Sequence, residues 1–421
     1  MRGKTRIAIV VTLASCSVAS AGGVILYEVG TPDVGLASAG WAARAEDAAT
    51  ILTNPAGMTR LQRSDLMLGM QALYGSIGLT PDSRTTTSGG DGGNPIGWFP
   101  GGGFYYLNAT SERLRLGLAA TGNFGLGLDY DDDWAGRYYV QDSTLIGVSI
   151  MPAVAWKIDE TFSIGAALNA TYGVFDTRVA VNNILPSAPD GGLKLEDTAW
   201  GFGGNVGILF EPKEGSRFGL TYTSRVELDF GDTPEFTDLA PGMSAALGAA
   251  GLLGTPLDLS LTVPQTVMAS FVQRLDDRWL LLGNVGWQDW SAFGQVDVQV
   301  GSDDPRSLTV DKNFKDTWHA AVGAQVKTSS PWSVSFGAAY DSSCIDDSER
   351  TPTLPLGESL RLGVGGRRPM NERLDLGIGY ELVWGGNLPM DQQRGPLSGR
   401  LAGTYEDTAM HFASANLRWK L

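Results

Sequence analysis

Apolar side chains alternate with small or polar ones, two residues apart, in segment after segment from Ser64 to Leu421. In residues 373–384 the apolar positions are Leu374, Leu376, Ile378, Tyr380, Leu382 and Trp384, and between them lie Asp375, Gly377, Gly379 and Glu381. Because successive side chains of a β-strand point to opposite faces, each of these segments predicts a strand with one apolar face. A soluble sandwich of two sheets alternates in the same way, so the pattern alone leaves both architectures open.

The alternating segments number about fourteen, an even number, and most reach the roughly 9 to 11 residues that a tilted strand needs to cross a membrane. The predicted strands are residues 64–78, 101–108, 113–130, 137–156, 161–181, 199–210, 216–230, 257–273, 278–300, 314–327, 332–342, 358–366, 373–384 and 405–421. No apolar run approaches the roughly 20 residues of a membrane-spanning helix, which excludes a helical membrane protein.

The connections between these strands are sorted by length. Short polar joins follow the even-numbered strands, at residues 109–112, 157–160, 211–215, 274–277, 328–331 and 367–372. Long joins follow the odd-numbered strands, at residues 79–100, 131–136, 182–198, 231–258, 301–313, 343–357 and 385–404. A sandwich has no reason to sort its loops, whereas an outer-membrane barrel has short periplasmic turns and long extracellular loops. The chain is therefore predicted to be all-β, a transmembrane antiparallel β-barrel of about 14 strands over residues 64–421.

The first residues have the character of an export signal. Basic residues within positions 2–6 precede an apolar stretch, residues 7–13, and a small-residue cleavage site that ends at Ala21. This order predicts a signal peptide over residues 1–21. Leu13-Ala14-Ser15-Cys16 also resembles the box at which bacterial lipoproteins are acylated, so processing at Cys16 is the alternative.

Residues 22–63 lie between the signal and the first strand, and they show no two-residue alternation. They are rich in Gly and Ala and contain the turn signal Asn54-Pro55-Ala56, in which Pro55 fixes φ and lacks a backbone donor. We predict that this segment is a hatch, a plug folded inside the lumen of the barrel.

Several short sequences recur in the order and spacing of a known family. They are Glu46-Asp47-Ala48-Ala49, Asn54-Pro55-Ala56, Asn123-Phe124-Gly125, residues 132–138, Trp200-Gly201-Phe202, Glu211-Pro212, residues 261–264, 287–293, 315–318, 321–324, 339–341 and 350–352. With these motifs nearly the whole chain after residue 21 resembles the outer-membrane long-chain fatty-acid transporter family, which also includes channels for aromatic hydrocarbons. The resemblance implies fourteen strands, an N-terminal hatch, and passive uptake of hydrophobic small molecules, most notably long-chain fatty acids.

The resemblance also implies an inward kink in the third strand, which opens a gap through which substrate leaves sideways into the outer membrane. The matching positions are Gly122, Asn123, Phe124 and Gly125. Glycines at both ends of this stretch weaken a strand and permit a bulge, although an ordinary glycine-rich strand is the alternative. We expect Asn54-Pro55-Ala56 of the hatch to lie opposite the gap.

Two groups of residues are candidates for contact with substrate. An outer group lies in residues 238–253, whose spacing of apolar residues predicts a short amphipathic helix, and it comprises Leu239, Met243, Leu247, Leu252 and Leu253. As an exposed patch this helix would capture substrate, and otherwise it only packs the loop. An inner group at the start of the hatch comprises Val24, Ile25, Leu26 and Tyr27, which contact either ligand or the barrel wall.

A carboxylate substrate needs a cation inside the lumen. The two-residue alternation predicts that six cationic side chains point into the lumen: Arg113, Arg115, Arg217, Arg225, Lys327 and Arg361. Of these, Arg115 and Arg217 are the chosen candidates. Each can instead pair with Glu46, Asp47, Asp375 or Glu381. A lumen without a free cation would favour uncharged substrates such as hydrocarbons.

Other functions find less support in the sequence. The formal net charge of −15 argues against nucleic acid as a partner. The chain has 2 histidines and no hydrolase or zinc motif, so we expect no enzyme, no cofactor and no metal site. We expect a monomer whose partners are a hydrophobic ligand, outer-membrane lipid and lipopolysaccharide. A general porin for hydrophilic solutes is a further alternative, which the hatch argues against.

Overall fold

The computed structural model describes residues 25–184, 188–300, 306–311 and 313–421. The predicted signal peptide, the alternative acylation site Cys16 and the candidate Val24 lie outside the described residues. Fourteen of the fifteen strands in the main sheet form a closed antiparallel barrel, and β1 pairs with β19 to close it. The predicted transmembrane barrel of about 14 strands is thereby confirmed.

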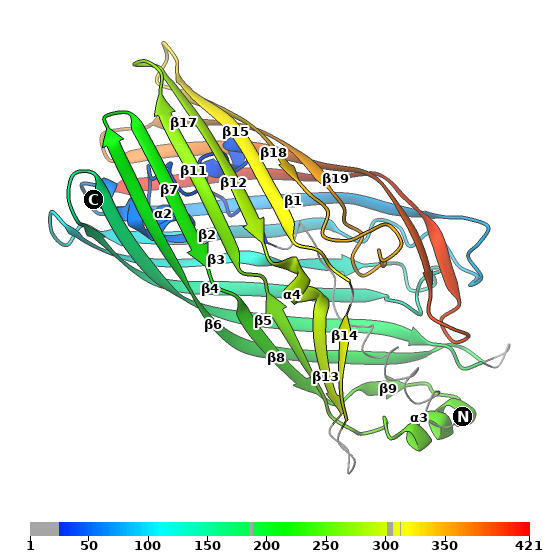
Figure 1. Ribbon diagram of the computed structural model, residues 1–421. Helices are drawn as coiled ribbons and strands as arrows, with labels where there is room; N and C mark the ends of the chain where they lie inside the picture. Colours follow the sequence, from blue (N-terminus) through cyan, green and yellow to red (C-terminus); the bar gives the residue numbers. More distant parts are fainter. Residues whose placement is uncertain (1–24, 185–187, 301–305, 312) are drawn as a thin grey trace.

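Each barrel strand pairs with the barrel strands that come before and after it in the chain. These strands are β1 (Asp65–Pro81), β2 (Gly97–Asn108), β3 (Leu114–Asp129), β4 (Asp142–Lys157), β5 (Phe162–Val181), β6 (Gly191–Lys213), β7 (Ser216–Thr223), β11 (Thr266–Arg274), β12 (Trp279–Gln288), β15 (Thr317–Lys327), β16 (Ser333–Asp341), β17 (Ser359–Pro369), β18 (Leu374–Gln393) and β19 (Arg400–Lys420). The short turns lie at the end that carries the C-terminus, and the long loops lie at the other end (Figure 1).

Above the long-loop end, segments that follow the barrel strands form further structure. A four-stranded sheet contains β8 (Val226–Asp232), β10 (Leu257–Val263), β13 (Gln295–Val300) and β14 (Arg306–Asp311). The remaining elements there are β9 (Glu235–Thr237), which pairs with β6, and the helices α3 (Pro241–Ala250) and α4 (Trp290–Gly294). The helix predicted within residues 238–253 is therefore present.

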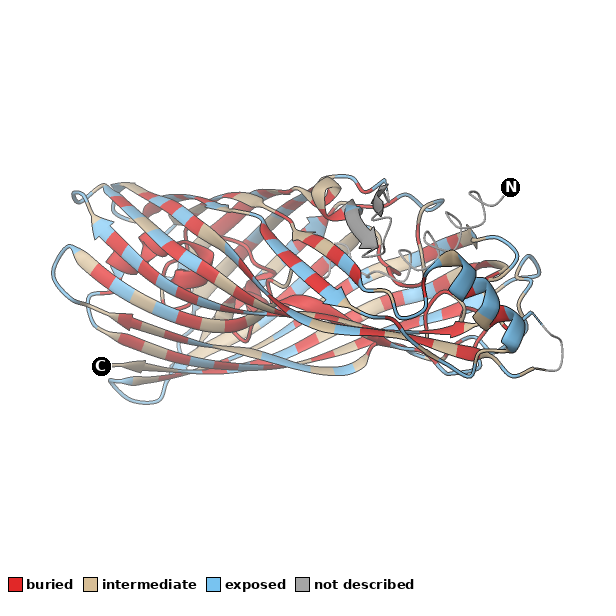
Figure 2. Cartoon of the chain, turned by 90° about the horizontal axis from the view of Figure 1, so that it is seen from below, coloured by how far each residue is buried: buried red, intermediate tan, exposed pale blue. Residues whose placement is uncertain are grey.

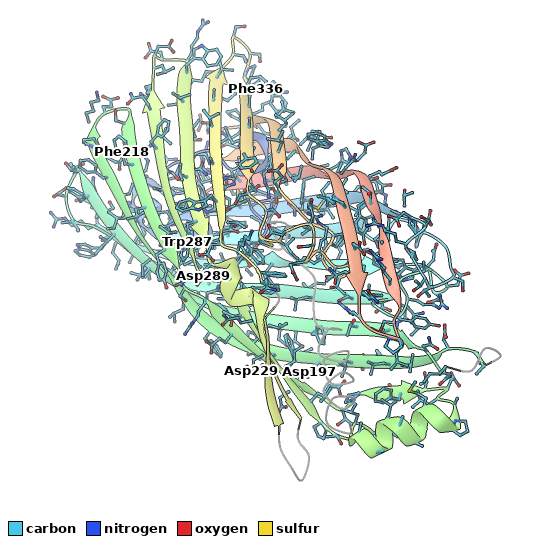
Figure 3. All side chains as sticks on the ribbon, turned by 45° about the vertical axis from the view of Figure 1, so that its right-hand side comes forward. Asp197, Phe218, Asp229, Trp287, Asp289 and Phe336 are labelled. Carbon is cyan, nitrogen blue, oxygen red and sulfur yellow. The ribbon has the colours of Figure 1, made fainter. Side chains whose placement is uncertain are left out.

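Three of the predicted strands are wrong because each spans two elements. The ranges 216–230, 257–273 and 278–300 break between β7 and β8, between β10 and β11, and at α4. Pro264 separates β10 from β11, since proline has no N–H to continue a ladder. At this junction Gln265 Nε2 donates to Asp289 Oδ2 over 2.7 Å, and further towards the long-loop end Gly231 N donates to Asp197 Oδ2 over 2.7 Å. Figure 3 labels the two carboxylates, Asp289 and Asp197. A fourth predicted strand, 137–156, begins only at Asp142.

The alternation of the sequence appears as alternating burial along the strands (Figure 2). Apolar side chains such as Phe218 and Phe336 point outward from the wall, each with 49% of its surface exposed, as expected of a lipid-facing surface (Figure 3). Polar side chains point into the lumen and are buried there by the hatch. Of the described helices, none is both long and apolar enough to cross a bilayer.

Residues 25–63, which we call the hatch, lie inside the barrel towards the short-turn end (Figure 1). The hatch contains η1 (Pro32–Leu36), α2 (Thr50–Thr53) and η2 (Pro55–Arg60). Its backbone groups are satisfied by side chains of the wall: Gly40 N donates to Asn284 Oδ1 over 2.7 Å, and Asn205 Nδ2 donates to Leu52 O over 2.7 Å. Buried backbone groups need such partners, so the polar lumen suits an irregular segment better than an apolar lumen would.

Glycines of the wall let the hatch backbone approach closely. A Cβ at Gly219 of β7 would lie 1.9 Å from Ala42 O, and a Cβ at Gly337 of β16 would lie 1.8 Å from Leu36 O. Neither contact is possible with a larger residue. These wall glycines therefore position the hatch.

Candidate functional site

The third strand, β3, contains a bulge. Its register with β4 shifts between Gly122 and Phe124, so that Asn123 has no partner on β4. Gly125 has a φ of +136°, and a Cβ there would lie 2.4 Å from Leu145 O. Only glycine fits this position without strain. The bulge lies where the sequence predicted one.

Beside the bulge, the hydrogen-bond ladder between β2 and β3 is interrupted. The two strands pair from Asn108 and Leu116 up to Gly103 and Thr121, and beyond that point β2 pairs only with β1 and β3 only with β4. At the long-loop end β3 contacts the segment just before β2, where Asp129 N donates to Pro95 O over 2.8 Å. The wall thus has a bounded break in its ladder, which we call the side break.

A phenylalanine lies at the side break. Phe99 of β2 is partly buried and packs against the large apolar cluster of the lumen. Its ring atom Cε2 lies 3.7 Å from the position of a Cβ built at Gly127 of β3. The ring therefore reaches from β2 towards β3 across the unpaired stretch.

The start of the hatch lies against the bulge. Ile25 forms an isolated antiparallel bridge with Phe124, and Leu26 N donates to Asn123 O over 2.9 Å. These two residues come from the inner group that the sequence singled out. The structure thereby brings the inner group and the bulge together.

The two groups line one space, which we call the inner cavity and which encloses about 80 Å³ of free volume. Its lining comprises Ile25, Leu26, Tyr27, Trp41, Leu52, Asn123, Phe124, Ser149, Met151, Asn169, Thr171, Asn205, Thr221, Thr223, Ser224, Val226, Val263, Pro264, Thr266, Met268 and Gln288. No charged residue is among these lining residues of the described chain. Several of the polar ones bond each other, as in the 2.7 Å contact from Thr221 Oγ1 to Asn205 Oδ1. The cavity therefore offers apolar surface and neutral polar groups.

The structure places Asn54-Pro55-Ala56 away from the bulge, in contrast to the sequence-based expectation. Asn54 Nδ2 donates to Ala42 O over 2.7 Å and to Ile208 O of β6 over 3.0 Å. A Cβ at Gly165 of β5 would lie 2.4 Å from Ala56 N. The turn thus fixes the hatch to β5 and β6, because the Asn54 amide donates to backbone carbonyls and a glycine of the wall, Gly165, faces the turn.

The two candidate cations do not line the inner cavity. Arg115 Nε donates to Leu61 O over 2.9 Å and so holds the end of the hatch. Arg217 lines a separate space at the short-turn end. A third inward cation, Arg361, is engaged by Asp341, Glu28 and Glu381. The outer group is split as well: Met243, Leu247 and Leu252 are buried against the ends of β5 and β6, Leu239 is partly buried, and Leu253 is exposed.

Sequence reasoning missed Phe99, because it fell in the predicted loop 79–100. The signal available was local: residues 97–100 read Gly-Trp-Phe-Pro before a run of glycines, so aromatic anchors precede a weak strand. Asn183, in the predicted loop 182–198, accepts at its Oδ1 a hydrogen bond from Ala240 N over 2.8 Å, so this part of the loop adjoins the helix of the outer group.

Comparisons with known proteins show to which family the chain belongs. Residues 11–419 match the family model described as outer membrane protein transport protein (OMPP1/FadL/TodX). The chain is 25% identical over 420 residues to a long-chain fatty acid transport protein of Escherichia coli, with 93% of each protein covered. It is also 25% identical over 410 residues to outer membrane protein P1 of Haemophilus influenzae, with 87% of each covered.

Solved structures show the same fold. A FadL homologue of Pseudomonas aeruginosa matches with a TM-score of 0.85 at 18% identity, covering 95% of this chain and 100% of that one. The toluene transporter TodX of P. putida matches with a TM-score of 0.67 at 13% identity, covering 92% and 99%. The chain belongs to the outer membrane protein transport protein (OMPP1/FadL/TodX) family and is an outer-membrane β-barrel.

Proposed function

We propose that this barrel carries hydrophobic small molecules passively into the outer membrane, with long-chain fatty acids as the first candidate substrate. Substrate is captured at the extracellular loops, enters the inner cavity, and leaves sideways through the side break. The observation that carries the proposal is that the uncharged inner cavity is lined by the bulge of β3, next to the stretch where β2 and β3 are unpaired. The gate comprises Gly122, Asn123, Phe124 and Gly125 with the ring of Phe99.

Physical chemistry favours this route. Each buried CH₂ group of a substrate gains about 0.8 kcal/mol on leaving water, so an apolar cavity attracts long chains strongly. Below the cavity the hatch fills the lumen, and its backbone is hydrogen-bonded to polar wall residues such as Asn284 and Asn205. A hydrophobic molecule gains nothing from passing these groups, whereas the membrane lies directly outside the side break.

Hydrocarbons and other uncharged compounds are the second candidate substrates, and the inner cavity itself favours them. A carboxylate buried there would find no cationic side chain in the lining. Burying an unpaired charge is costly, so a fatty acid would need its carboxylate to stay in water at the extracellular loops or to enter protonated. Relatives and structural neighbours carry both names, long-chain fatty acid transport protein and toluene transporter.

We also propose that the chain is no enzyme. Ser38 Oγ lies 2.9 Å from His319 Nε2, and His319 Nδ1 lies 2.7 Å from Asp341 Oδ1, in the order of a hydrolase triad. All three are buried, and Ser38 Oγ donates over 2.6 Å to Ala37 O. We interpret this chain of bonds as a fastening between hatch and wall. The second histidine, His411, bonds Tyr380 on the exposed face.

The remaining parts of the proposal concern partners. Lipid and lipopolysaccharide surround the barrel, and the protein acts as a monomer, because one closed barrel contains the complete route. A general porin function is disfavoured by the buried hatch. Asn54-Pro55-Ala56 contributes by fastening the hatch and not by lining the exit.

Uptake by intact cells with and without this protein tests the proposal. The probes are radiolabelled oleate, radiolabelled toluene and a small sugar as porin control. Uptake of oleate alone supports fatty acids, and uptake of toluene alone supports hydrocarbons. Uptake of the sugar with neither of the others would overturn the proposal and make the chain a porin.

A further inference from the structure

The short-turn end of the lumen contains a second space, which we call the vestibule. It has a volume of about 840 Å³ and opens to the periplasm. Residues of the hatch and the ends of the barrel strands line it, and it shares no lining residue with the inner cavity. The hatch therefore separates two spaces of different chemistry.

The vestibule is richer in positive charge than the rest of the protein. Its lining contains eight Lys or Arg residues and six Asp or Glu residues. The whole chain, in contrast, has 31 Lys and Arg against 46 Asp and Glu, a net charge of −15. The positive excess is thus a local feature.

Some of the cations already have carboxylate partners. The pairs are Arg60 with Glu211, Arg274 with Glu214 at 3.5 Å, Arg367 with Glu46 at 3.4 Å, and Arg418 with Asp65 at 2.6 Å. Within the described part of the chain, the side chains of Arg217, Arg278, Lys327 and Lys213 make no hydrogen bond or ion pair. Four cations are therefore available at the wall of the vestibule.

Arg217 is the most unusual of these cations. It lies at the start of β7 and only 7% of its surface is exposed. Buried arginine is normally paired, because an unpaired buried charge loses its hydration without compensation. The charge of Arg217 also affects Arg60 of the hatch. Burial is the first cause and the charge of Arg217 the second that lower the pKa of the Arg60 guanidinium to about 10. Arg60 remains charged at neutral pH, so the positive potential persists.

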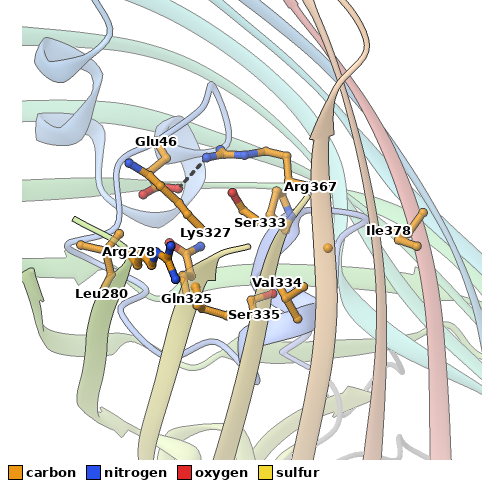
Figure 4. Close-up of a pocket in the computed structure, with 13 residues that line it drawn as sticks. Glu46, Arg278, Leu280, Gln325, Lys327, Ser333, Val334, Ser335, Arg367 and Ile378 are labelled. Atoms are coloured by element: carbon orange, nitrogen blue, oxygen red, sulfur yellow. Dashed lines mark ion pairs between the residues drawn. The ribbon is translucent and has the colours of Figure 1, made fainter. Parts of the chain in front are cut away.

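A smaller cavity adjoins the vestibule and shows the same imbalance (Figure 4). Its charged lining consists of Arg278, Lys327, Arg367 and the single carboxylate Glu46. Burial raises the pKa of Glu46, but Arg367 and Arg44 outweigh this and hold that pKa below its ordinary value. One ionised carboxylate therefore faces three cations.

We propose that the vestibule binds a small oxyanion, a phosphate or a carboxylate, that enters from the periplasmic side. Arg217, Arg278 and Lys327 are its ligands, since charge-assisted hydrogen bonds from such groups are the usual means of holding these anions. The bound anion would lie between the wall and Arg60 of the hatch, and would thereby fasten the hatch at its lower side. This site is independent of the proposed transport route.

Binding of inorganic phosphate and of acetate to the purified full-length protein in an uncharged detergent tests the site. Line broadening of the phosphate ³¹P signal gives the dissociation constant for phosphate, and acetate is measured by its competition, both at ionic strength held constant with sodium chloride. We expect saturable binding, weakened about tenfold or more by Arg217→Gln and several-fold by Lys327→Gln. Arg217→Lys should restore part of the affinity.

Arg178→Gln is the matched control, because Arg178 is an exposed arginine at the opposite end of the barrel. It should leave binding unchanged, and heat-modifiable gel migration checks that every variant is folded. Competition by acetate would show that carboxylates share the site, and its failure would restrict the site to phosphates. Absence of saturable binding, or equal affinity in wild type and Arg217→Gln, would overturn the proposal without touching the transport function.

Discussion

The inner cavity and the vestibule lie on opposite sides of the hatch and differ in almost every physical respect. The inner cavity has no charged lining and adjoins the side break, whereas the vestibule has eight cationic residues and opens towards water. A hydrophobic molecule is stabilised in the inner cavity relative to water and would be destabilised in the vestibule. The hatch therefore divides the lumen by chemistry as well as by volume. It also explains why a sideways exit is favoured over passage to the periplasm.

The largest effect is expected from closing the exit of the inner cavity with Gly125→Asp. The backbone at Gly125 is left-handed, and Leu145 O lies 2.4 Å from any Cβ there, so the bulge must rearrange. We expect uptake of hydrophobic substrate to fall about tenfold or more, while the outward faces that insert into the membrane are unchanged. Uptake of oleate and toluene by intact cells measures the loss, and gel migration checks assembly.

Gly204→Ala on β6 is the matched control, because the nearest atom to a Cβ there, Ala167 O, is 3.4 Å away. It should retain uptake. Normal uptake by a folded Gly125→Asp variant would contradict an exit through the side break, since substrate would then have to pass the hatch and the vestibule.

The second prediction gives the inner cavity a charge. Ile25→Lys places a cation next to the bulge, in a lining that has none. We expect uptake of toluene to fall about tenfold because the ammonium and its water occupy apolar space, while a carboxylate gains a partner. The ratio of oleate to toluene uptake is the measurement. Ile158→Lys, on an exposed turn, is the control. Equal losses for both substrates would show that fatty acids do not place their carboxylate in this cavity.

How far the sequence predicts this arrangement can be judged from particular elements. The barrel was predictable because lipid on one side and a polar lumen on the other impose alternation on every strand. The same rule made the ranges 216–230 and 257–273 wrong, because Val226, Leu228 and Phe230 continue to alternate in the sheet above the barrel. A two-sided sheet has the same period wherever it lies, so period cannot locate the rim.

The candidate site was predictable in its parts and not in its assembly. The glycines of Gly122–Gly125 indicated a bulge, and the apolar start of the hatch stood out in a polar lumen. Which hatch segment meets which strand depends on tertiary contacts, such as those of Asn54 with Ala42 and Ile208, which no local pattern encodes. The two-residue alternation correctly predicted that Arg217 points into the lumen. It could not predict on which side of the hatch this residue lies.

The third prediction concerns the ring at the side break. Phe99→Ala removes the side chain that reaches towards Gly127, so the exit should widen. We expect the initial rate of hydrophobic uptake to rise about threefold if passage through the break limits the rate. Phe218→Ala, which removes the same side chain from an outward position on β7, should change nothing. A fall in uptake for Phe99→Ala would instead make this ring part of the binding surface.

The smallest effect on transport is expected from loosening the partition itself with Asn54→Ala. This change leaves the carbonyl of Ala42 and the N–H of Ala56 without their side-chain partner, at a cost of about 1–3 kcal/mol for each buried group left unsatisfied. The hatch should then open locally more often, which hydrogen exchange of residues 40–60 would detect, and sugar entry should rise by less than about twofold. Asn387→Ala, whose side chain is exposed and accepts a hydrogen bond from Asp407 N, is the control.

Hydrophobic uptake should stay near the wild-type level in Asn54→Ala, because the inner cavity and the side break lie on the other side of the hatch from the vestibule. A loss of hydrophobic uptake as large as that of Gly125→Asp would show that the Asn54-Pro55-Ala56 turn acts on the exit after all. In that case the hydrogen bonds of this turn would influence the conformation of the bulge, through the contacts of Ile25 and Leu26 with β3. The two spaces would then be coupled, and the oxyanion site of the vestibule would be able to regulate transport instead of only fastening the hatch.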